Sequence, residues 1–384
     1  MLSDLVMKHS EIAARRLISQ GISSTIKRSP AEVVDGLGAM QAQDYLGALW
    51  AIAVRTPGTT EAEVEKAIAN REIVRTWPMR GTLHFIPAED VRWMLELLTP
   101  RVIAGCKRRW EELELNEKVF TKARKIIERA LVGGKHLSRP AVMELLDRGG
   151  IVSANQRGIH ILSRLAMERV LCFGPRIGKQ PSFLLLDEWI PTSRLLDREA
   201  SLAAMARRYF HGHGPATLQD FVWWTGLKAS DAKAGLANVA PELERISSDG
   251  VEYWMQPNID TRGSKQPQLF LLPPFDEYLV GYRDRSAALE PHHANQVVPG
   301  GNGIFLPIVV QKGRVIGTWR RALQRNRVLV SASTFTPRSQ LQKQAFVRAA
   351  KAYGQFLNLE TEVEFHTPGP SSDSASSLRV ASVE

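Results

Sequence analysis

The sequence predicts an α+β protein with three tandem winged helix-turn-helix motifs and a C-terminal β-rich domain. Three observations support this fold class. Helix start signals recur in pairs along the first two-thirds of the chain, two short β-rich segments follow each pair, and β-rich segments dominate beyond residue 261. With 384 residues, of which 44% are hydrophobic and 23% charged, the chain is typical of a folded globular protein with several domains.

The first winged helix is assigned to residues 1–110. The sequence Ser-Pro-Ala-Glu at residues 29–32 is typical of a capping box with proline at the first helical position, and apolar residues follow it at helical spacing. Thr60 opens a second helix, with a glutamate three positions later. The β-rich segments 73–77 and 82–86 then flank a Pro-Met-Arg-Gly turn, which predicts a hairpin, the wing of the motif.

The same order of elements recurs twice, in residues 111–195 and in residues 196–260. For the second motif, the pattern predicts helices at residues 138–149 and 153–168 and strands at residues 170–173 and 182–186. For the third motif, it predicts helices opened by Thr217 and Ser230 and strands at residues 243–247 and 251–255. The repeat is one of pattern and not of residue identity.

The remaining domain is assigned to residues 261–365 and is expected to form a partial β-barrel. Its β-rich segments are followed by a helix over residues 339–357, and Lys312-Gly313 marks a hairpin. Residues 366–384 are rich in serine and proline and have few large apolar side chains, so we expect this tail to be disordered.

Positive charge is concentrated in the C-terminal domain. The chain has a formal net charge of +10 and a pI near 9.7, and residues 291–359 contain no acidic residue and ten basic ones. These are Lys312, Arg314, Arg320, Arg321, Arg325, Arg327, Arg338, Lys343, Arg348 and Lys351. Such clustered charge supplies the salt-sensitive part of binding to a nucleic-acid backbone. The alternative is a basic, solvated surface without a partner.

Several other function classes lack their signatures. Cys106 and Cys172 are the only cysteines and lie far apart, which argues against a disulfide framework or a thiolate zinc site. Neither of the two close histidine pairs belongs to a metal-binding motif, and the chain has no P-loop and no Gly-x-Ser-x-Gly motif, so we expect no metal and no cofactor. The apolar runs are too short to cross a bilayer and the N-terminus lacks a signal-peptide core, which predicts a cytoplasmic location without membrane contact.

The sequence Met-Gln-Ala-Gln-Asp at residues 40–44 places two glutamines two positions apart. A helix would turn Gln41 and Gln43 toward different faces, whereas an extended segment brings them to one side. The helix that opens at Ser29 ends near Met40, so the pair falls where the chain leaves that helix. We therefore predict that both amides face one water molecule.

Five segments between residues 40 and 321 together resemble the winged-helix DNA glycosylase family, the AlkZ-like enzymes. They are MQAQDYLGALWAIAVRT, VRTWPMRGTLHFIPAED, GPATLQDFVWWTGL, LLPPFDEYLVGYRDRS and GRVIGTWRR, in the family's order. The resemblance implies three tandem winged helices around a DNA-binding channel, with a β-barrel-like element. It also places Gln41 and Gln43 on the two positions of the catalytic Gln-apolar-Gln motif, with Ala42 as a small apolar residue between them. Asp44 follows the motif and is distinct from the aspartate that ends it in another branch of the family.

The resemblance implies a monofunctional glycosylase that hydrolyses the N-glycosidic bond of N7- or N3-alkylated purines in double-stranded DNA, with interstrand crosslinks as a further class of substrate. An alkylated purine is cationic and leaves readily, so two amide oxygens that orient one water suffice where a stronger base might be expected. Without an amine nucleophile, the product is an abasic site. A bulky lesion is accepted if it need not be flipped into a closed pocket.

The residues around the motif are assigned supporting roles. Arg80, Thr82 and His84 share one face if residues 80–84 are extended. We expect Arg80 to bind a phosphate and His84 to support the water or the sugar, with packing inside the wing as the alternative for each. Trp77 is assigned to the core or to anchoring the hairpin, with a stacking platform as the alternative, and Arg320 and Arg321 are assigned to DNA contacts. Interdomain docking, with DNA contact as the alternative, is assigned to Asp276, Glu277, Tyr278 and Arg285.

Two other functions remain open from the residues. A winged-helix transcriptional regulator would bind DNA without catalysis, and a hydrolase or scaffold unrelated to nucleic acids would lack salt-dependent affinity for a duplex. Because three winged helices on one chain remove the usual need for dimerisation, we expect a monomer. If DNA is the partner, the expected location is the nucleoid-associated cytoplasm.

Overall fold

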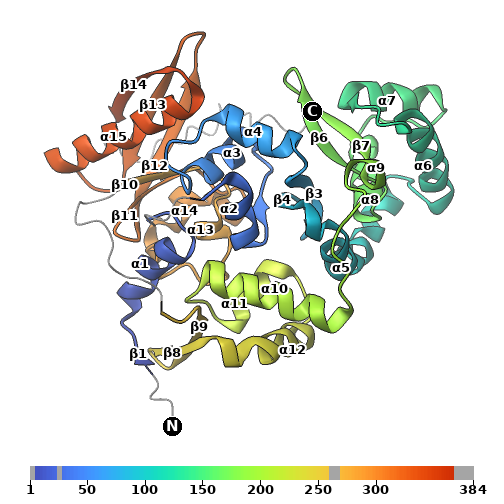
Figure 1. The fold of residues 1–384 in the computed structure, drawn as a ribbon. Coiled ribbons are helices and arrows are strands. Elements are labelled where there is room, and N and C mark those ends of the chain that lie inside the picture. The colour runs from blue at the N-terminus through green and yellow to red at the C-terminus, as the bar shows by residue number, and fades with distance from the viewer. Residues whose placement is uncertain (1–4, 24–27, 259–268, 367–384) are drawn as a thin grey trace.

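The computed structural model describes residues 5–23, 28–258 and 269–366 (Figure 1). The serine- and proline-rich tail, for which the sequence predicts disorder, lies outside the described residues apart from His366. Within these ranges no helix is both long enough and apolar enough to cross a membrane. Cys106 and Cys172 are both free thiols.

One arrangement of elements occurs three times in the chain up to Met255: a helix, a short extended segment, two further helices and a hairpin. The first unit contains α2 (Pro30–Leu37), β2 (Met40–Gln41), α3 (Tyr45–Ala53), α4 (Glu61–Ala69), β3 (Ile73–Met79) and β4 (Thr82–Pro87). The second contains α6 (Glu117–Leu131), β5 (Leu137–Ser138), α7 (Arg139–Arg148), α8 (Arg157–Met167), β6 (Leu171–Ile177) and β7 (Gln180–Leu185). The third contains α10 (Arg198–His213), α11 (Leu218–Thr225), α12 (Ala229–Val239), β8 (Glu244–Ser248) and β9 (Val251–Met255).

Strand pairing confirms that the three units share one plan. In each, the segment after the first helix pairs antiparallel with the second strand of the hairpin. The pairs are Met40 with Phe85, Leu137 with Phe183, and Ala216 with Trp254. Helix, short strand, two helices and a hairpin is the winged-helix plan, so the predicted fold class is confirmed.

Local sequence signals explain most helix boundaries. Ser29, Thr60 and Thr217 each cap a helix, and in every case the acidic residue three positions later bonds back to the cap, as the capping-box pattern predicts. Ser153 does not cap α8. It hydrogen-bonds to Asp147 instead, and the helix begins four residues later.

Besides α6, α10 and the long helix Val91–Glu112, the sequence also did not predict helix α3. Its sequence, YLGALWAIA, is apolar on nearly every face, and seven of its nine residues are buried. A helix covered on all sides has no amphipathic period by which it can be recognised.

The first two units share one sheet, whose strand order is β2-β4-β3-β6-β7-β5. The two wings join where Arg75 of β3 pairs with Phe173 of β6. The third unit has a separate sheet, β1-β8-β9, in which β1 (Leu5–Val6) runs parallel to β8.

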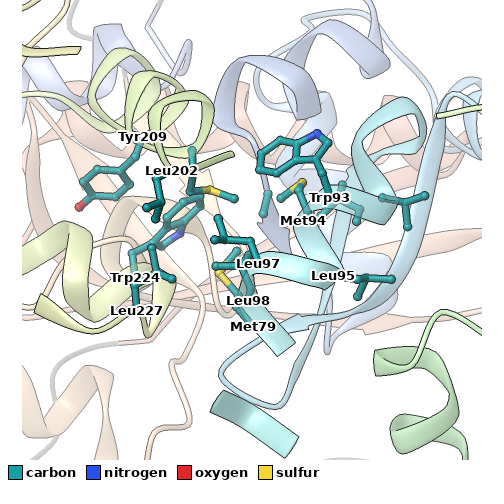
Figure 2. Close-up of a cluster of buried hydrophobic side chains, with 14 of the residues drawn as sticks. Met79, Trp93, Met94, Leu95, Leu97, Leu98, Leu202, Tyr209, Trp224 and Leu227 are labelled. Carbon is teal, nitrogen blue, oxygen red and sulfur yellow. The ribbon is translucent and has the colours of Figure 1, made fainter. Parts of the chain in front are cut away.

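A long helix, α5 (Val91–Glu112), follows the first hairpin and helps to hold the third unit against the first two. Figure 2 shows Trp93, Met94, Leu97 and Leu98 of α5 in one apolar cluster with Met79 of β3 and with Leu202, Tyr209, Trp224 and Leu227 of the third unit. All of these side chains are buried. This core brings the end of the first hairpin next to helix α11.

The C-terminal domain is an open five-stranded sheet with the order β10-β11-β12-β13-β14, and its two edge strands do not close into a barrel. Its elements are β10 (Leu269–Leu272), β11 (Ile308–Gln311), β12 (Arg314–Leu323), β13 (Arg327–Thr334), α15 (Gln340–Leu357) and β14 (Glu360–His366). Helix α15 packs Tyr353 and Phe356 against Trp50 of α3, which fixes the domain to the first unit. The shorter elements are α1 (His9–Ser19), η1 (Ala88–Asp90), α9 (Leu186–Trp189), η2 (Ala240–Glu242), α13 (Glu277–Val280), η3 (Pro291–His293), α14 (Ala294–Val297) and η4 (Pro299–Gly301).

Strand β14 places acidic side chains beside the basic region of residues 291–359. The strand was not expected from the sequence, and it lies parallel to β13. Its three glutamates, Glu360, Glu362 and Glu364, are all exposed. One of them, Glu362, pairs with Arg327 at 3.2 Å. Part of the positive charge of residues 291–359 is therefore offset by the next strand.

Two buried ion pairs anchor the segment that contains α13. Arg55 binds both carboxylate oxygens of Asp276 at 2.9 Å. Asp220, which lies 3.6 Å from Arg16, accepts from the backbone N–H of Arg283 at 2.9 Å. The hydroxyl of Tyr278 lies 3.1 Å from the carbonyl of Ala13, near the N-terminus, and 2.6 Å from the carbonyl of Gly313. Asp276 and Tyr278 therefore dock the C-terminal domain onto the rest of the chain, in agreement with the sequence-based expectation.

Candidate active site

The two glutamines converge at the edge of the first unit. Gln41 lies in β2, and Gln43 lies in the bend that precedes α3. The Nε2 of Gln41 donates to the Oε1 of Gln43 at 2.5 Å. Gln41 is half-buried and Gln43 is exposed. The two amides thus meet at the surface and do not diverge across a helix, and each amide oxygen keeps a lone pair that can accept from a water.

The backbone between the glutamines is held from three directions. The backbone N–H of Gln41 donates to Oε1 of Glu277 at 2.8 Å. The N–H of Ala42 donates to the carbonyl of Leu83 at 2.7 Å, and the carbonyl of Ala42 accepts from Arg75 Nη2 at 2.7 Å. Every hydrogen bond comes from a different element, so the position of the two side chains is set by the packed fold and not by local turn geometry.

Arg75 is one of the residues that the sequence reading missed. Its guanidinium lies over the rings of Tyr45 and Phe173, at 5.0 Å and 4.7 Å from their centroids. Burial lowers the pKa of Arg75 to about 10, so it remains a cation at neutral pH. An arginine inside a β-rich run is ordinarily taken for a solvent-facing residue, and no sequence signal indicates that this one points inward.

Arg80 contacts the side chain of Gln41, whereas the ring of His84 contacts Arg80, and His84 lies opposite Gln41 only as its partner in the strand pairing. The sequence places Arg80 in the Pro-Met-Arg-Gly turn, and a face shared with Thr82 and His84 would have required an extended segment, which Arg80 does not form. It instead forms a two-residue turn with Gly81, with φ of 53° and 69°, which is the backbone of a tight hairpin turn. From there its Nη2 lies 3.3 Å from Gln41 Oε1 and 3.3 Å from His84 Nε2. Its Nη1 donates to the carbonyl of Trp224.

Thr82 contributes its backbone to this group and not its hydroxyl. The hydroxyl of Thr82 donates to the carbonyl of Met79 at 3.4 Å. The carbonyl of Thr82 lies 3.0 Å from His84 Nδ1, which places a proton on Nδ1 and leaves Nε2 to accept from Arg80. Burial and the charge of Arg80 lower the pKa of His84 to about 3, so the ring is neutral at physiological pH.

The neutral state of His84 predicts a pH dependence of stability. The unfolded chain takes up a proton near the ordinary pKa of 6.5, whereas the folded chain does so only near 3. The free energy of unfolding should therefore fall as the pH is lowered from 6.5 toward 3. Asparagine at position 84 can replace the Nδ1–H donor with its amide but does not titrate. In the His84→Asn variant, the decrease in the free energy of unfolding between pH 6.5 and 5.5 should therefore be about 1 kcal/mol smaller than in the wild type.

Urea denaturation of the two proteins at pH 7.5, 6.5 and 5.5 measures this difference. The variant His292→Asn is a suitable control, because His292 lies in a different part of the fold and its side chain is exposed. Parallel profiles for wild type and His84→Asn would contradict the assignment of a neutral, buried His84.

Glu277 lies directly behind the backbone of Gln41 and is also a residue that the sequence reading placed differently. It was assigned to docking, with DNA contact as the alternative. In the structure its carboxylate is buried and accepts from the Gln41 N–H, from Trp224 Nε1 at 2.8 Å and from His213 Nε2 at 3.3 Å. Burial by itself raises the pKa of Glu277, but the hydrogen bond from His213 and the charge of Arg80 hold it at about 2. Glu277 is therefore an anion inside the protein.

The two arginines expected to contact DNA face opposite sides of β12. Arg321 binds both carboxylate oxygens of Asp44 at 2.9 Å, and Asp44 in turn caps α3. Its guanidinium is thus already engaged in fixing the residue that follows Gln43. Arg320 is exposed on the other face of the strand.

Among the described residues, only one group of three or more histidine, cysteine, aspartate or glutamate side chains lies close enough together to hold a metal ion. Asp35, Glu89 and Asp90 lie close together. Arg208 bridges Asp35 and Asp90, and Arg194 bridges Glu89 and Asp90, so arginines occupy the positions that an ion would take. This cluster is an ion-pair network.

Comparison with known proteins identifies the family. The family described as "DNA glycosylase AlkZ-like" matches residues 34–356. The chain belongs to the AlkZ-like DNA glycosylase family. An interstrand DNA cross-link repair glycosylase of Streptomyces sahachiroi is 25% identical over 332 residues, which cover 80% of this chain and 86% of that protein. The structure of Streptomyces sahachiroi DNA glycosylase AlkZ matches with a TM-score of 0.77 and 21% identity, over 94% of this chain and 100% of the other.

Membership of the AlkZ-like family makes this protein a DNA glycosylase, a hydrolase of N-glycosyl bonds. The resemblance found in five sequence segments is thereby confirmed. The two other functions that the residues left open, a non-catalytic regulator and a hydrolase or scaffold unrelated to nucleic acids, do not fit this membership.

Proposed function

We propose that this AlkZ-like enzyme hydrolyses the N-glycosidic bond of N7- or N3-alkylated purines in double-stranded DNA, with a water positioned by Gln41 and Gln43. The observation that carries the proposal is the contact between the two amides on a backbone held from three directions. Within the described residues no lysine hydrogen-bonds to either glutamine, which favours a monofunctional enzyme. Since one chain provides the whole group, we also propose that the monomer is active.

The proposed reaction uses the lability of the damaged base. Alkylation leaves the purine cationic, so the C1′–N bond breaks with its electron pair going to the base, which departs neutral. Positive charge then resides on the sugar until the water oxygen bonds to C1′ and a proton is lost to solvent. Amides orient this water but abstract protons poorly, so neutral purines should leave slowly.

The open setting of the glutamines supports crosslinks as a further class of substrate. Gln43 is exposed, and both amides lie at an edge of the sheet rather than within a closed cavity. A bulky adduct therefore need not be fully flipped out of the duplex to meet them. The Streptomyces relative described as an interstrand cross-link repair glycosylase supports the same proposal.

Base release from defined duplexes tests the proposal. A duplex with one N7-methylguanine should yield free base and a strand that is cleaved only after alkali, and a nitrogen-mustard crosslinked duplex should be converted to separable strands. Release of undamaged guanine from the same duplex is the internal control. A protein that binds these duplexes without releasing a base would contradict the proposed substrates.

The opposite orientations of Arg320 and Arg321 predict separable effects on DNA binding. If Arg320 contacts a phosphate, Arg320→Gln should weaken duplex affinity for every sequence and reduce the slope of log affinity against log salt by about 1. Arg321→Gln should instead release Asp44 and lower the rate of base release. Fluorescence anisotropy over a salt series measures the slope, and an unchanged slope for Arg320→Gln would show that the phosphate contact is absent.

A further inference from the structure

Glu277 is a buried charge that the positioning of water does not require. Its carboxylate is 1% exposed and receives three hydrogen bonds, from the Gln41 backbone, the Trp224 indole and the His213 ring. A neutral glutamine could accept one or two of these at far lower desolvation cost. The fold thus retains an anion next to the candidate catalytic backbone, and a purely packing role does not explain its charge.

The cation that contacts the side chain of Gln41 explains why an anion is useful there. Arg80 contacts the Oε1 of Gln41 at 3.3 Å, and its other polar contacts are neutral: His84, the Trp224 carbonyl and the sulfur of Met79. Among the described residues Arg80 forms no direct ion pair. An uncompensated guanidinium at this point would repel both a cationic purine and the positively charged sugar that forms as the base leaves.

Trp224 connects the two charges. Its indole N–H donates to Glu277, and its backbone carbonyl accepts from Arg80. The tryptophan is itself buried in the core between the first and third units. The separation of anion and cation is therefore fixed by packing, and the negative charge of Glu277 offsets the positive charge of Arg80 while leaving the guanidinium free to donate to Gln41.

We propose that Glu277 is a positioning residue that also supplies negative charge behind Gln41, cancels the Arg80 cation and so favours the cationic sugar in the transition state. This inference rests on the proposed hydrolysis of alkylated purines. The α13 segment would thus stabilise positive charge on the sugar, in addition to holding the N–H of Gln41.

Equilibrium binding of abasic-site analogues tests the charge effect without catalysis. A duplex with a pyrrolidine abasic nucleotide carries a protonated ring nitrogen in place of the sugar cation, whereas a tetrahydrofuran abasic duplex is neutral there. Wild type should prefer the pyrrolidine duplex by at least about tenfold in Kd. Glu277→Gln should abolish this preference while it binds the tetrahydrofuran duplex within about threefold of wild type. Glu364→Gln, an equal charge change on exposed β14, should keep the preference.

Arg80 provides a second, independent variant. Removing the cation with Arg80→Gln should raise the preference for the pyrrolidine duplex, and combining Arg80→Gln with Glu277→Gln should restore part of what Glu277→Gln loses. A purely structural role for Glu277 predicts no such compensation. If Glu277→Gln does not fold, a failure of Arg80→Gln to raise the preference still overturns the inference.

The outcomes separate this inference from the proposed function. Base release by wild type together with equal affinity for the two abasic duplexes would overturn the role of Glu277 and leave the glycosylase proposal standing. No release of N7-methylguanine by wild type would overturn the proposed substrates whatever the binding preference. A folded Glu277→Gln protein that keeps the wild-type preference also overturns the inference.

Discussion

Alanine at both Gln41 and Gln43 is expected to reduce the rate of N7-methylguanine release by at least about 100-fold. The physical reason is the loss of the two acceptors that orient the water relative to C1′. The backbone that carries them is held by Glu277, Leu83 and Arg75, none of which is changed, so the fold should persist. Single-turnover base release at saturating enzyme measures the effect on the chemical step.

The two single variants sharpen this experiment. Because both amides act on one water, each single alanine should cost nearly as much as the pair, since groups that act as a unit are not additive. Gln344→Ala is a matched control, because Gln344 is an exposed glutamine on α15. Affinity for an undamaged duplex should stay within about threefold of wild type for all four variants. Unchanged base release by the double variant would remove Gln41 and Gln43 from the mechanism.

Replacement of Asp276 by asparagine is expected to destabilise the protein by about 3–5 kcal/mol. Arg55 and Asp276 are both buried, and the carboxylate binds the guanidinium with two hydrogen bonds of 2.9 Å. Loss of the carboxylate leaves a buried guanidinium with no countercharge. The first transition in a urea unfolding curve, followed by tryptophan fluorescence, measures the change.

Two controls distinguish the buried charge from a general effect of mutation. Glu112 pairs with Arg108 and Arg109 on the exposed surface of α5, and Glu112→Gln should change stability by at most about 0.5 kcal/mol. The double variant Arg55→Met with Asp276→Leu should be more stable than Asp276→Asn alone, because it removes both charges. If Asp276→Asn is as stable as Glu112→Gln, the ion pair contributes nothing to docking.

Local patterns in the chain were sufficient to predict the three winged-helix units. Capping boxes at Ser29, Thr60 and Thr217 use side chains three residues apart, so the sequence alone reveals where those helices begin. Alternating β-rich runs around a turn mark the three hairpins in the same way. The five segments that resemble AlkZ-like enzymes added the family, and with it the two glutamines.

Elements without a local period were not predictable. Helix α3 is buried on nearly all sides, and β14 follows a long helix with a charged, alternating sequence that offers little to distinguish a strand from a surface loop. Arg321 was assigned to DNA because it follows Arg320 in a basic run. Its ion pair with Asp44, which lies 277 residues away in sequence, could not be inferred from charge alone.

The sequence alone indicated which two glutamines lie on one side of the chain, because a two-residue spacing in an extended segment is a local property. The fold decided which groups surround them. Arg75 and Glu277 reach the glutamine motif from positions 33 and 236 residues distant, and Trp224 contacts Glu277 and Arg80. Such contacts depend on packing between units and on the burial of charge. Both join residues that are distant in the sequence, so neither produces a periodic pattern of residue types along the chain.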